Sequence, residues 1–163
     1  YKAVFENAPP HVQEAMEISY LCAARKGDVL SMTWDQIRDE GIFIQQGKTN
    51  VKQIKEWTPR LRKAIELAKS LRTGNIISRW VICQANGKCY TGRGFDQGWM
   101  DAREAARAIT NMALDFTFHD LKAKSISDYE GSTKDKQIFS GHKTERQVNT
   151  YDRKVKVVPS LKK

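Results

Sequence analysis

The sequence predicts an α+β fold that is mainly helical, with one small antiparallel sheet near residues 35–57. Two observations support this prediction. Stretches such as 60–71 and 95–113 place apolar residues at helical spacing. In contrast, GIFIQQ (41–46) and VKQIKEWT (51–58) alternate in the manner of strands. The 163 residues, 40% of them hydrophobic, suit a single domain with an ordinary core.

Local signals place the individual elements. A polar turn at 47–50 joins the two strands, and Thr58 with Pro59 supplies an N-cap and a first-turn proline for the next helix. That helix is expected to end at Arg72-Thr73-Gly74. Segment 76–84 fits either a strand or a buried helix, and a tight turn follows at Asn86-Gly87. The remaining helices are expected over 9–24, Asp28–Thr33, 95–113, His119–Tyr129, Lys134–Phe139 and Thr144–Arg153, with Gly131 and Gly141-His142 as breaks.

The chain ends and the cysteines indicate a setting for the protein. No run of apolar residues reaches the roughly 18 that a membrane span needs, and the first residues do not form a signal peptide. Because there is no initiator Met, we expect residues 1–163 to be one domain of a longer protein. Three cysteines without a CxxC pair argue against a disulfide framework or a zinc site, which favours a cytoplasmic location.

The net charge of +9 is concentrated in two parts of the chain. Residues 46–72 carry eight Lys or Arg against two acidic residues, and residues 134–163 carry nine against three. Residues 1–45 are net negative, and residues 73–133 are neutral. Basic residues gathered in this way predict a polyanionic partner such as nucleic acid. The alternative is a solvated basic surface.

Four short motifs carry candidate chemistry. In ARKGD, Arg25 lies three residues before Asp28; alone, such a pair is usually a surface ion pair. Lys48 lies at the tip of the predicted hairpin, where a lysine usually only aids solubility.

The other two motifs lie in the second half of the chain. In HDLK, His119 and Lys122 are three residues apart, so they share one helix face and can address one anion. In SGHKTERQVNTYDR, His142 precedes Tyr151 by nine residues. Taken alone, the first pair is an ordinary exposed helix start, and a tyrosine on a short helix is usually packing.

The order of the four motifs changes their meaning. CAARKGDVLSMTWDQI, QQGKTNVKQIKEWTP, FTFHDLKAKSISDYEG and FSGHKTERQVNTYDR resemble, in sequence, the successive boxes of a tyrosine recombinase catalytic domain of the phage-integrase kind. The resemblance runs from about residue 10 to residue 158. It implies a C-terminal catalytic domain of an integrase, a site-specific recombinase that cleaves and rejoins DNA through a 3′-phosphotyrosyl intermediate.

The resemblance also implies a role for each motif residue. Tyr151 would be the nucleophile, His119 the general base and Lys48 the general acid for the leaving 5′-oxygen. The residues that would stabilise charge on the phosphate oxygens are Arg25, Lys122 and His142. Asp28 would orient a basic neighbour. No metal or other cofactor is expected, and the sequence has no Asp and Glu cluster with metal-binding spacing.

The implied partner is double-stranded DNA, on which a homo-oligomer, expected to be a tetramer, assembles; the isolated chain is expected to be a monomer. The candidate DNA-binding residues are Lys52, Lys55, Lys124, Lys143 and Arg146. The tail 155–163 is expected to dock on a sheet of its own or a neighbouring protomer, and a frayed terminus is the alternative.

One position departs from the family pattern. The second box usually reads HxxR, but here Lys122 stands where the second arginine belongs. Lysine keeps the charge and loses the planar fork that grips two phosphate oxygens. A second hypothesis is therefore a DNA-binding domain of the same fold with impaired or lost cleavage. A third, from another class, is a basic interaction domain whose motif spacing is accidental.

Overall fold

The computed structural model describes residues 1–72, 77–155 and 157–161. Its helices are α1 (Lys2–Glu6), α2 (Pro10–Cys22), α3 (Lys26–Leu30), α4 (Pro59–Ser70), α5 (Gly92–Thr110), α6 (Asp120–Asp128), α7 (Thr133–Ser140) and α8 (Glu145–Tyr151). A short 3-10 helix, η1 (Trp34–Gln36), precedes strands β1 (Gly41–Gln45) and β2 (Lys52–Glu56). The predicted fold class, mainly helical α+β with one small antiparallel sheet, is confirmed.

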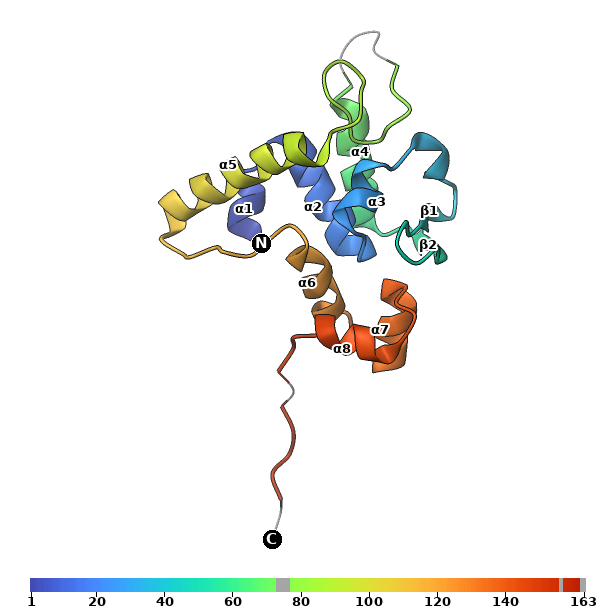
Figure 1. The fold of residues 1–163 in the computed structure, drawn as a ribbon, viewed down its shortest axis with the longest axis vertical. Helices are drawn as coiled ribbons and strands as arrows, with labels where there is room; N and C mark the ends of the chain where they lie inside the picture. The colour runs from blue at the N-terminus through green and yellow to red at the C-terminus, as the bar shows by residue number, and fades with distance from the viewer. Residues whose placement is uncertain (73–76, 156, 162–163) are drawn as a thin grey trace.

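Helix α2 is the central element of the fold. It starts with Pro10 in its first turn, where a missing N–H costs nothing, and it contacts α1, α3, α4, α5 and α6 (Figure 1). Buried Val12, Met16 and Ile18 place it in the main hydrophobic core. The helix ends at Ala23 in the left-handed conformation, with φ 50°, so the chain turns sharply just before Arg25.

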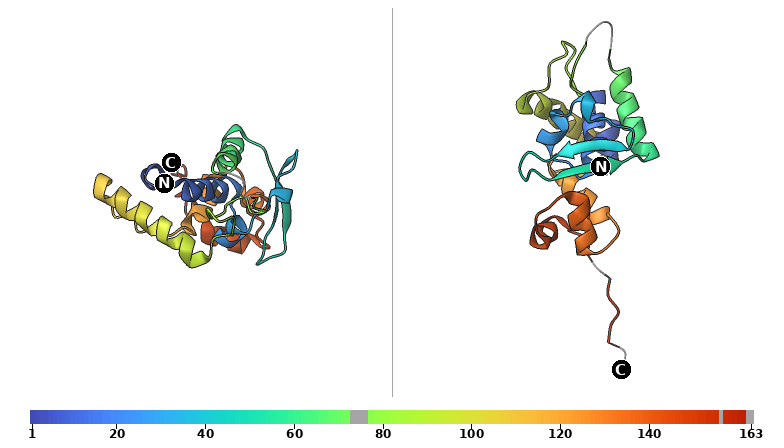
Figure 2. Two further views of the ribbon diagram at one scale, coloured as in Figure 1. Left: turned by 90° about the horizontal axis from the view of Figure 1, so that it is seen from above. Right: turned by 90° about the vertical axis from the view of Figure 1, so that its right-hand side faces the viewer.

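The hairpin lies along one side of the helical body, above the last three helices (Figure 2). Gly41 pairs with Glu56 and Gln45 with Lys52, so the two segments form the antiparallel hairpin that the sequence predicts. Ile42 and Ile44 of β1 face the core. On β2, the side chain of Gln53 donates to the Ile138 carbonyl and that of Lys55 to the Phe139 carbonyl, so the strand also binds α7.

Helices α6, α7 and α8 pack around a second, smaller core. Buried Ile126 of α6 and Val148 of α8 meet Ala23 there, with Phe139 and Tyr151 partly buried against them. Together these three helices form the lower part of the molecule in Figure 1. Since α6 also contacts α2, the C-terminal motifs are held against the end of the helix that precedes Arg25.

Some predicted boundaries were wrong. Segment 77–84 is neither the strand nor the buried helix that the composition allowed; it forms only single bridges, Thr33 with Trp80 and Cys83 with Cys89. Position 76 and the predicted stop at Thr73-Gly74 lie outside the described residues. Helix α5 starts three residues earlier than expected, because the Thr91 hydroxyl accepts from the Gly94 N–H as an N-cap.

The chain after α8 runs away from the body in Figure 1. Its apolar side chains are exposed: Val155 at 88%, Val157 at 99%, Val158 at 73% and Leu161 at 85%. The described part of the tail is therefore not docked on the sheet of its own chain, so docking in cis was a wrong expectation. Among the described residues, no helix is long and apolar enough to cross a lipid bilayer.

Candidate active site

Tyr151 lies beside both motif histidines. Its hydroxyl is 3.0 Å from Nε2 of His119, and its ring centroid is 4.8 Å from that of His142. His119 caps the start of α6, whereas Tyr151 ends α8. The packing of α6 against α8 thus brings together two residues that are 32 positions apart in the sequence.

The segment around Tyr151 is fixed by contacts on both sides. Asp152 forms a short ion pair with Lys136 of α7, 2.7 Å, between side chains that are 15% and 8% exposed. Arg153 pairs with Asp120 at 2.8 Å. The hydroxyl of Ser127 on α6 accepts from the Arg153 N–H at 2.8 Å. The nucleophile candidate is therefore held against α6 and α7 of its own chain.

His142 is almost fully buried beside Tyr151. Burial, with smaller effects from Lys122 and Arg25, lowers its pKa to about 4. Nδ1 of His142 lies 2.7 Å from the Ser140 hydroxyl, which donates its single proton to the Lys136 carbonyl. Nε2 of His142 is buried and has no hydrogen-bond partner among the described residues.

Burial also lowers the pKa of His119. The negative charge of Asp120 opposes this shift, whereas three nearby cations, Lys122, Arg25 and Arg153, lower the pKa further. A neutral imidazole 3.0 Å from a phenol hydroxyl can accept its proton. The role of His119 as the base stays a prediction.

Arg25 lies between an amide and a carboxylate. Its Nη1 donates to Oε1 of Gln46 at 2.6 Å and lies 4.0 Å from Oδ2 of Asp28. The side chain is 17% exposed. Since a guanidinium has five N–H donors, these contacts leave others for an anion, which suits the phosphate role expected for Arg25.

Lys48 is exposed at the tip of the hairpin, and both of its neighbours are tied down. The Gly47 N–H donates to Oδ1 of Asp28 at 3.0 Å, and the Thr49 hydroxyl donates to Oε1 of Gln46 at 3.0 Å. Asp28 therefore contacts both Arg25 and the turn that carries Lys48, which fits the orienting role expected for it.

Lys122 does not lie on the surface of the site. It is 0% exposed, and its Nζ donates to the carbonyls of Ala23 and, at 3.2 Å, Ser140. Burial, aided by the charges of Arg25 and Lys55, lowers its pKa to about 7. A direct phosphate contact, expected from the family pattern, would require this ammonium group to leave its two carbonyl partners.

The candidate DNA-binding residues divide into two groups. Lys52, Lys143 and Arg146 are exposed, and Lys124 is exposed while paired with Asp128 at 2.7 Å. Lys55 instead turns inward: its Nζ donates to the Phe139 carbonyl and lies 4.6 Å from the centroid of the Phe139 ring. Burial lowers the pKa of Lys55 to about 8.

Sequence reasoning missed Gln46 and Ser140, which connect the motifs. The Ser140 carbonyl accepts from both Gln46 and Lys122. Gln46 is only 3% exposed, an uncommon state for glutamine; its place beside the lysine turn was the one available signal. Among the described residues, no group of His, Cys, Asp or Glu could hold a metal ion.

The arrangement brings together groups of the kind that phosphoryl transfer uses. The Tyr151 hydroxyl lies 3.0 Å from Nε2 of His119, and Asp28 contacts both Arg25 and the turn that carries Lys48. Groups fixed in advance stabilise developing charge without reorganising during the reaction.

Comparisons with known proteins show which family and fold this chain shares. The model of the phage integrase family matches residues 3–156. The integrase of Escherichia phage lambda is 26% identical over 155 residues, which cover 90% of this chain and 42% of that protein. The chain thus spans less than half of that relative's length.

Solved structures share the fold. A lambda integrase dimer bound to a COC′ core site superposes with a TM-score of 0.78 at 22% identity, over 98% of this chain and 60% of that chain. A lambda integrase tetramer bound to a Holliday junction gives 0.76 at 22% identity, over 99% and 49%. Because the family model covers nearly the whole sequence and the motif residues converge in space, the chain belongs to the phage integrase family.

Proposed function

We propose that this chain is the catalytic domain of a site-specific DNA recombinase that cleaves and rejoins DNA through a 3′-phosphotyrosyl intermediate. The observation that carries the proposal is the 3.0 Å contact between Nε2 of His119 and the hydroxyl of Tyr151, next to the guanidinium of Arg25 and the ring of His142.

In the proposed reaction, the Tyr151 oxygen attacks the phosphorus, and the bond to the deoxyribose 5′-oxygen breaks. His119 accepts the phenol proton, and Lys48 gives a proton to the leaving 5′-oxygen. Arg25 and His142 stabilise the charge that builds on the non-bridging oxygens. A bound phosphodiester adds a negative charge that favours the imidazolium form of His142. The phosphotyrosyl link keeps the bond energy, so a 5′-hydroxyl can reverse the step.

The proposed partner is double-stranded DNA in the cytoplasm, with exposed Lys52, Lys124, Lys143 and Arg146 on its phosphates. The lambda integrase dimer and tetramer on DNA support a homo-oligomer on the recombination site. We propose that residues 1–163 form one domain of a longer integrase, since the lambda relative is more than twice as long.

Covalent trapping tests the reaction. The chain is incubated with a pool of nicked duplexes whose core is randomised, and protein–DNA adducts that survive detergent are isolated. An adduct on Tyr151, located by mass spectrometry and absent from Tyr151→Phe, is the expected result. An adduct that persists unchanged in Tyr151→Phe would rule out Tyr151 as the nucleophile.

The burial of Lys122 favours a second candidate, a DNA-binding domain in which cleavage is impaired. Its Nζ is occupied by two carbonyls and lacks the fork of the family's arginine. In this case the wild-type chain would bind DNA without forming the adduct, and Lys122→Arg would raise adduct formation. If Lys122→Arg folds and gives no more adduct than the wild type, lysine is not the limiting feature.

A further inference from the structure

The side chain of Gln46 joins three parts of the candidate site. Gln46 follows β1 directly and lies at the base of the lysine turn. Its Oε1 accepts from Arg25 at 2.6 Å and from Thr49 at 3.0 Å, and its Nε2 donates to the Ser140 carbonyl at 2.8 Å. The side chain is 3% exposed, so water does not compete for these bonds.

Only a carboxamide satisfies all three neighbours at once. The guanidinium of Arg25 requires an acceptor, whereas the carbonyl of Ser140 requires a donor. The reverse orientation of the amide would point N–H groups at the guanidinium, so the network fixes the orientation. A carboxylate at position 46 would hold Arg25 and repel the Ser140 carbonyl, and an apolar side chain would bind neither.

The partners of Gln46 lie close to the proposed catalytic groups. Arg25 is the proposed phosphate contact, Thr49 follows Lys48, and the Ser140 hydroxyl lies 2.7 Å from Nδ1 of His142. The backbone of Gln46 also closes the turn, since its carbonyl accepts from the Asn50 N–H at 2.8 Å. Gly141, with φ +65°, gives the amide the room it needs: a Cβ at that position would lie 2.2 Å from Nε2 of Gln46.

We propose that Gln46 is a positioning residue that sets Arg25 in register with the Lys48 turn and with the end of α7 that carries His142. The expected effect of Gln46 on the cleavage rate rests on the proposed function, whereas its expected effect on the order of the Arg25 side chain does not. Side chains held in advance by such bonds act without paying an ordering cost when substrate binds.

The kinetic test compares two neighbouring glutamines. Gln46→Met removes both hydrogen-bonding groups and keeps the length of the side chain; Gln45→Met makes the same change at the adjacent, exposed position. In single-turnover cleavage of a trapped DNA substrate, Gln46→Met should be slower by roughly 10- to 100-fold with DNA affinity unchanged, whereas Gln45→Met should match the wild type.

A double substitution separates positioning from loss of structure. If Gln46 acts through Arg25, Gln46→Met should cost little further rate in an Arg25→Ala background, because contacting residues are not additive. An equal fold-loss in both backgrounds would overturn the inference. Gln46→Glu, which keeps the acceptor for Arg25, should recover part of the rate, and it replaces Gln46→Met if that variant does not fold.

A measurement without DNA tests the same inference independently of the chemistry. The ¹⁵N relaxation of the Arg25 Nε–H group should report a rigid side chain in the wild type and in Gln45→Met, and a mobile one in Gln46→Met. An equally rigid Arg25 in Gln46→Met overturns the positioning role. If the wild type does not cleave DNA, the proposed function is overturned. The relaxation measurement alone then decides whether Gln46 positions Arg25.

Discussion

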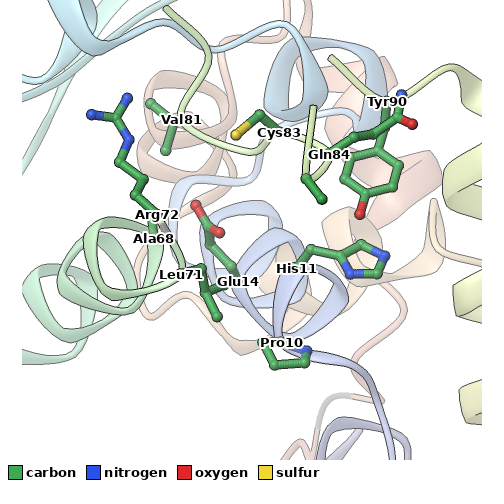
Figure 3. A pocket seen from close by; sticks show the side chains of 11 residues that line it. Pro10, His11, Glu14, Ala68, Leu71, Arg72, Val81, Cys83, Gln84 and Tyr90 are labelled. Carbon is green, nitrogen blue, oxygen red and sulfur yellow. The ribbon is translucent and has the colours of Figure 1, made fainter. Parts of the chain in front are cut away.

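Glu14 carries the sharpest stability prediction, because it is a buried carboxyl group. It is 1% exposed, and its Oε1 has no hydrogen bond among the described residues. It points into a small pocket of about 200 Å³ between α2, the end of α4 and segment 81–90 (Figure 3). Nη2 of the nearby Arg72 donates to the Ser78 carbonyl at 2.6 Å, and its guanidinium lies 4.1 Å from the centroid of the Trp34 ring.

Burial raises the pKa of Glu14 to about 9, against a smaller opposing effect of the Arg72 charge. Between pH 4.5 and 9 the folded chain thus keeps a proton that the unfolded chain releases. The folded state binds more protons, so the free energy of unfolding falls as pH rises through this window, by about 1.4 kcal/mol per pH unit. Below pH 4.5 both states are protonated, and the group has no effect on pH dependence.

The perturbation is Glu14→Gln, which keeps size and polarity but does not titrate. Relative to the wild type, this variant should gain about 4 kcal/mol between pH 5 and pH 8, a shift of roughly 10 °C in the unfolding midpoint. Other titrating groups, including Lys122 and Lys55, are common to both proteins and cancel in the difference.

The assay is urea unfolding of both proteins at pH 5, 6, 7 and 8, followed by tryptophan fluorescence. The matched control is Glu66→Gln on the exposed face of α4, because the carboxylate there lies in solvent in the folded and the unfolded state. The difference in unfolding free energy between this variant and the wild type should not change with pH. If the Glu14→Gln and wild-type curves also run parallel, Glu14 ionises in the folded protein and the reasoning is refuted.

Three further predictions concern the site and the tail. His119→Asn should slow single-turnover cleavage by roughly 10²- to 10⁴-fold and remove the loss of rate at acid pH; an unchanged acid limb would exclude His119 as the base. Deleting residues 155–163 should leave the unfolding midpoint unchanged, since the apolar side chains there are exposed, while weakening assembly on a full recombination site. If the truncated and the full chain, each joined to an N-terminal domain, assemble equally well, the tail has no role in assembly. DNA binding at pH 7 should be accompanied by proton uptake. Because the buffer supplies these protons, the observed binding enthalpy should change with the ionisation enthalpy of the buffer. An identical binding enthalpy in all buffers would contradict this prediction.

The sequence predicted those elements whose signals are local. The hairpin followed from strict alternation, and the start of α4 from Thr58 and Pro59, whose cap the structure shows as a bond from the Leu61 N–H to the Thr58 hydroxyl. Segment 77–84 could not be assigned because distant residues hold it. Its Val81 N–H donates to the Met32 carbonyl, and its Arg79 carbonyl accepts from the Trp34 N–H, so neither helical nor strand periodicity governs it.

The candidate site shows the same division. Motif spacing identified Tyr151, His119 and His142, which the fold brings together. It did not reveal that Lys122 is buried beneath the site or that Gln46 is the link between motifs. The burial of Lys122 and the hydrogen bonds of Gln46 depend on how α2, α6 and α7 pack with the hairpin. No local sequence pattern predicts this packing.

The charges at the site explain why DNA binding and protonation should be linked. Arg25 and Lys55 are charged neighbours of Lys122. Burial lowers the pKa of His142, and the charges of Lys122 and Arg25 lower it further. Burial, with a smaller contribution from these neighbouring cations, lowers the pKa of His142 to about 4 and that of Lys122 to about 7. A phosphate brought among these groups favours their charged forms. We therefore expect the positive charge of the site to increase when a phosphodiester binds.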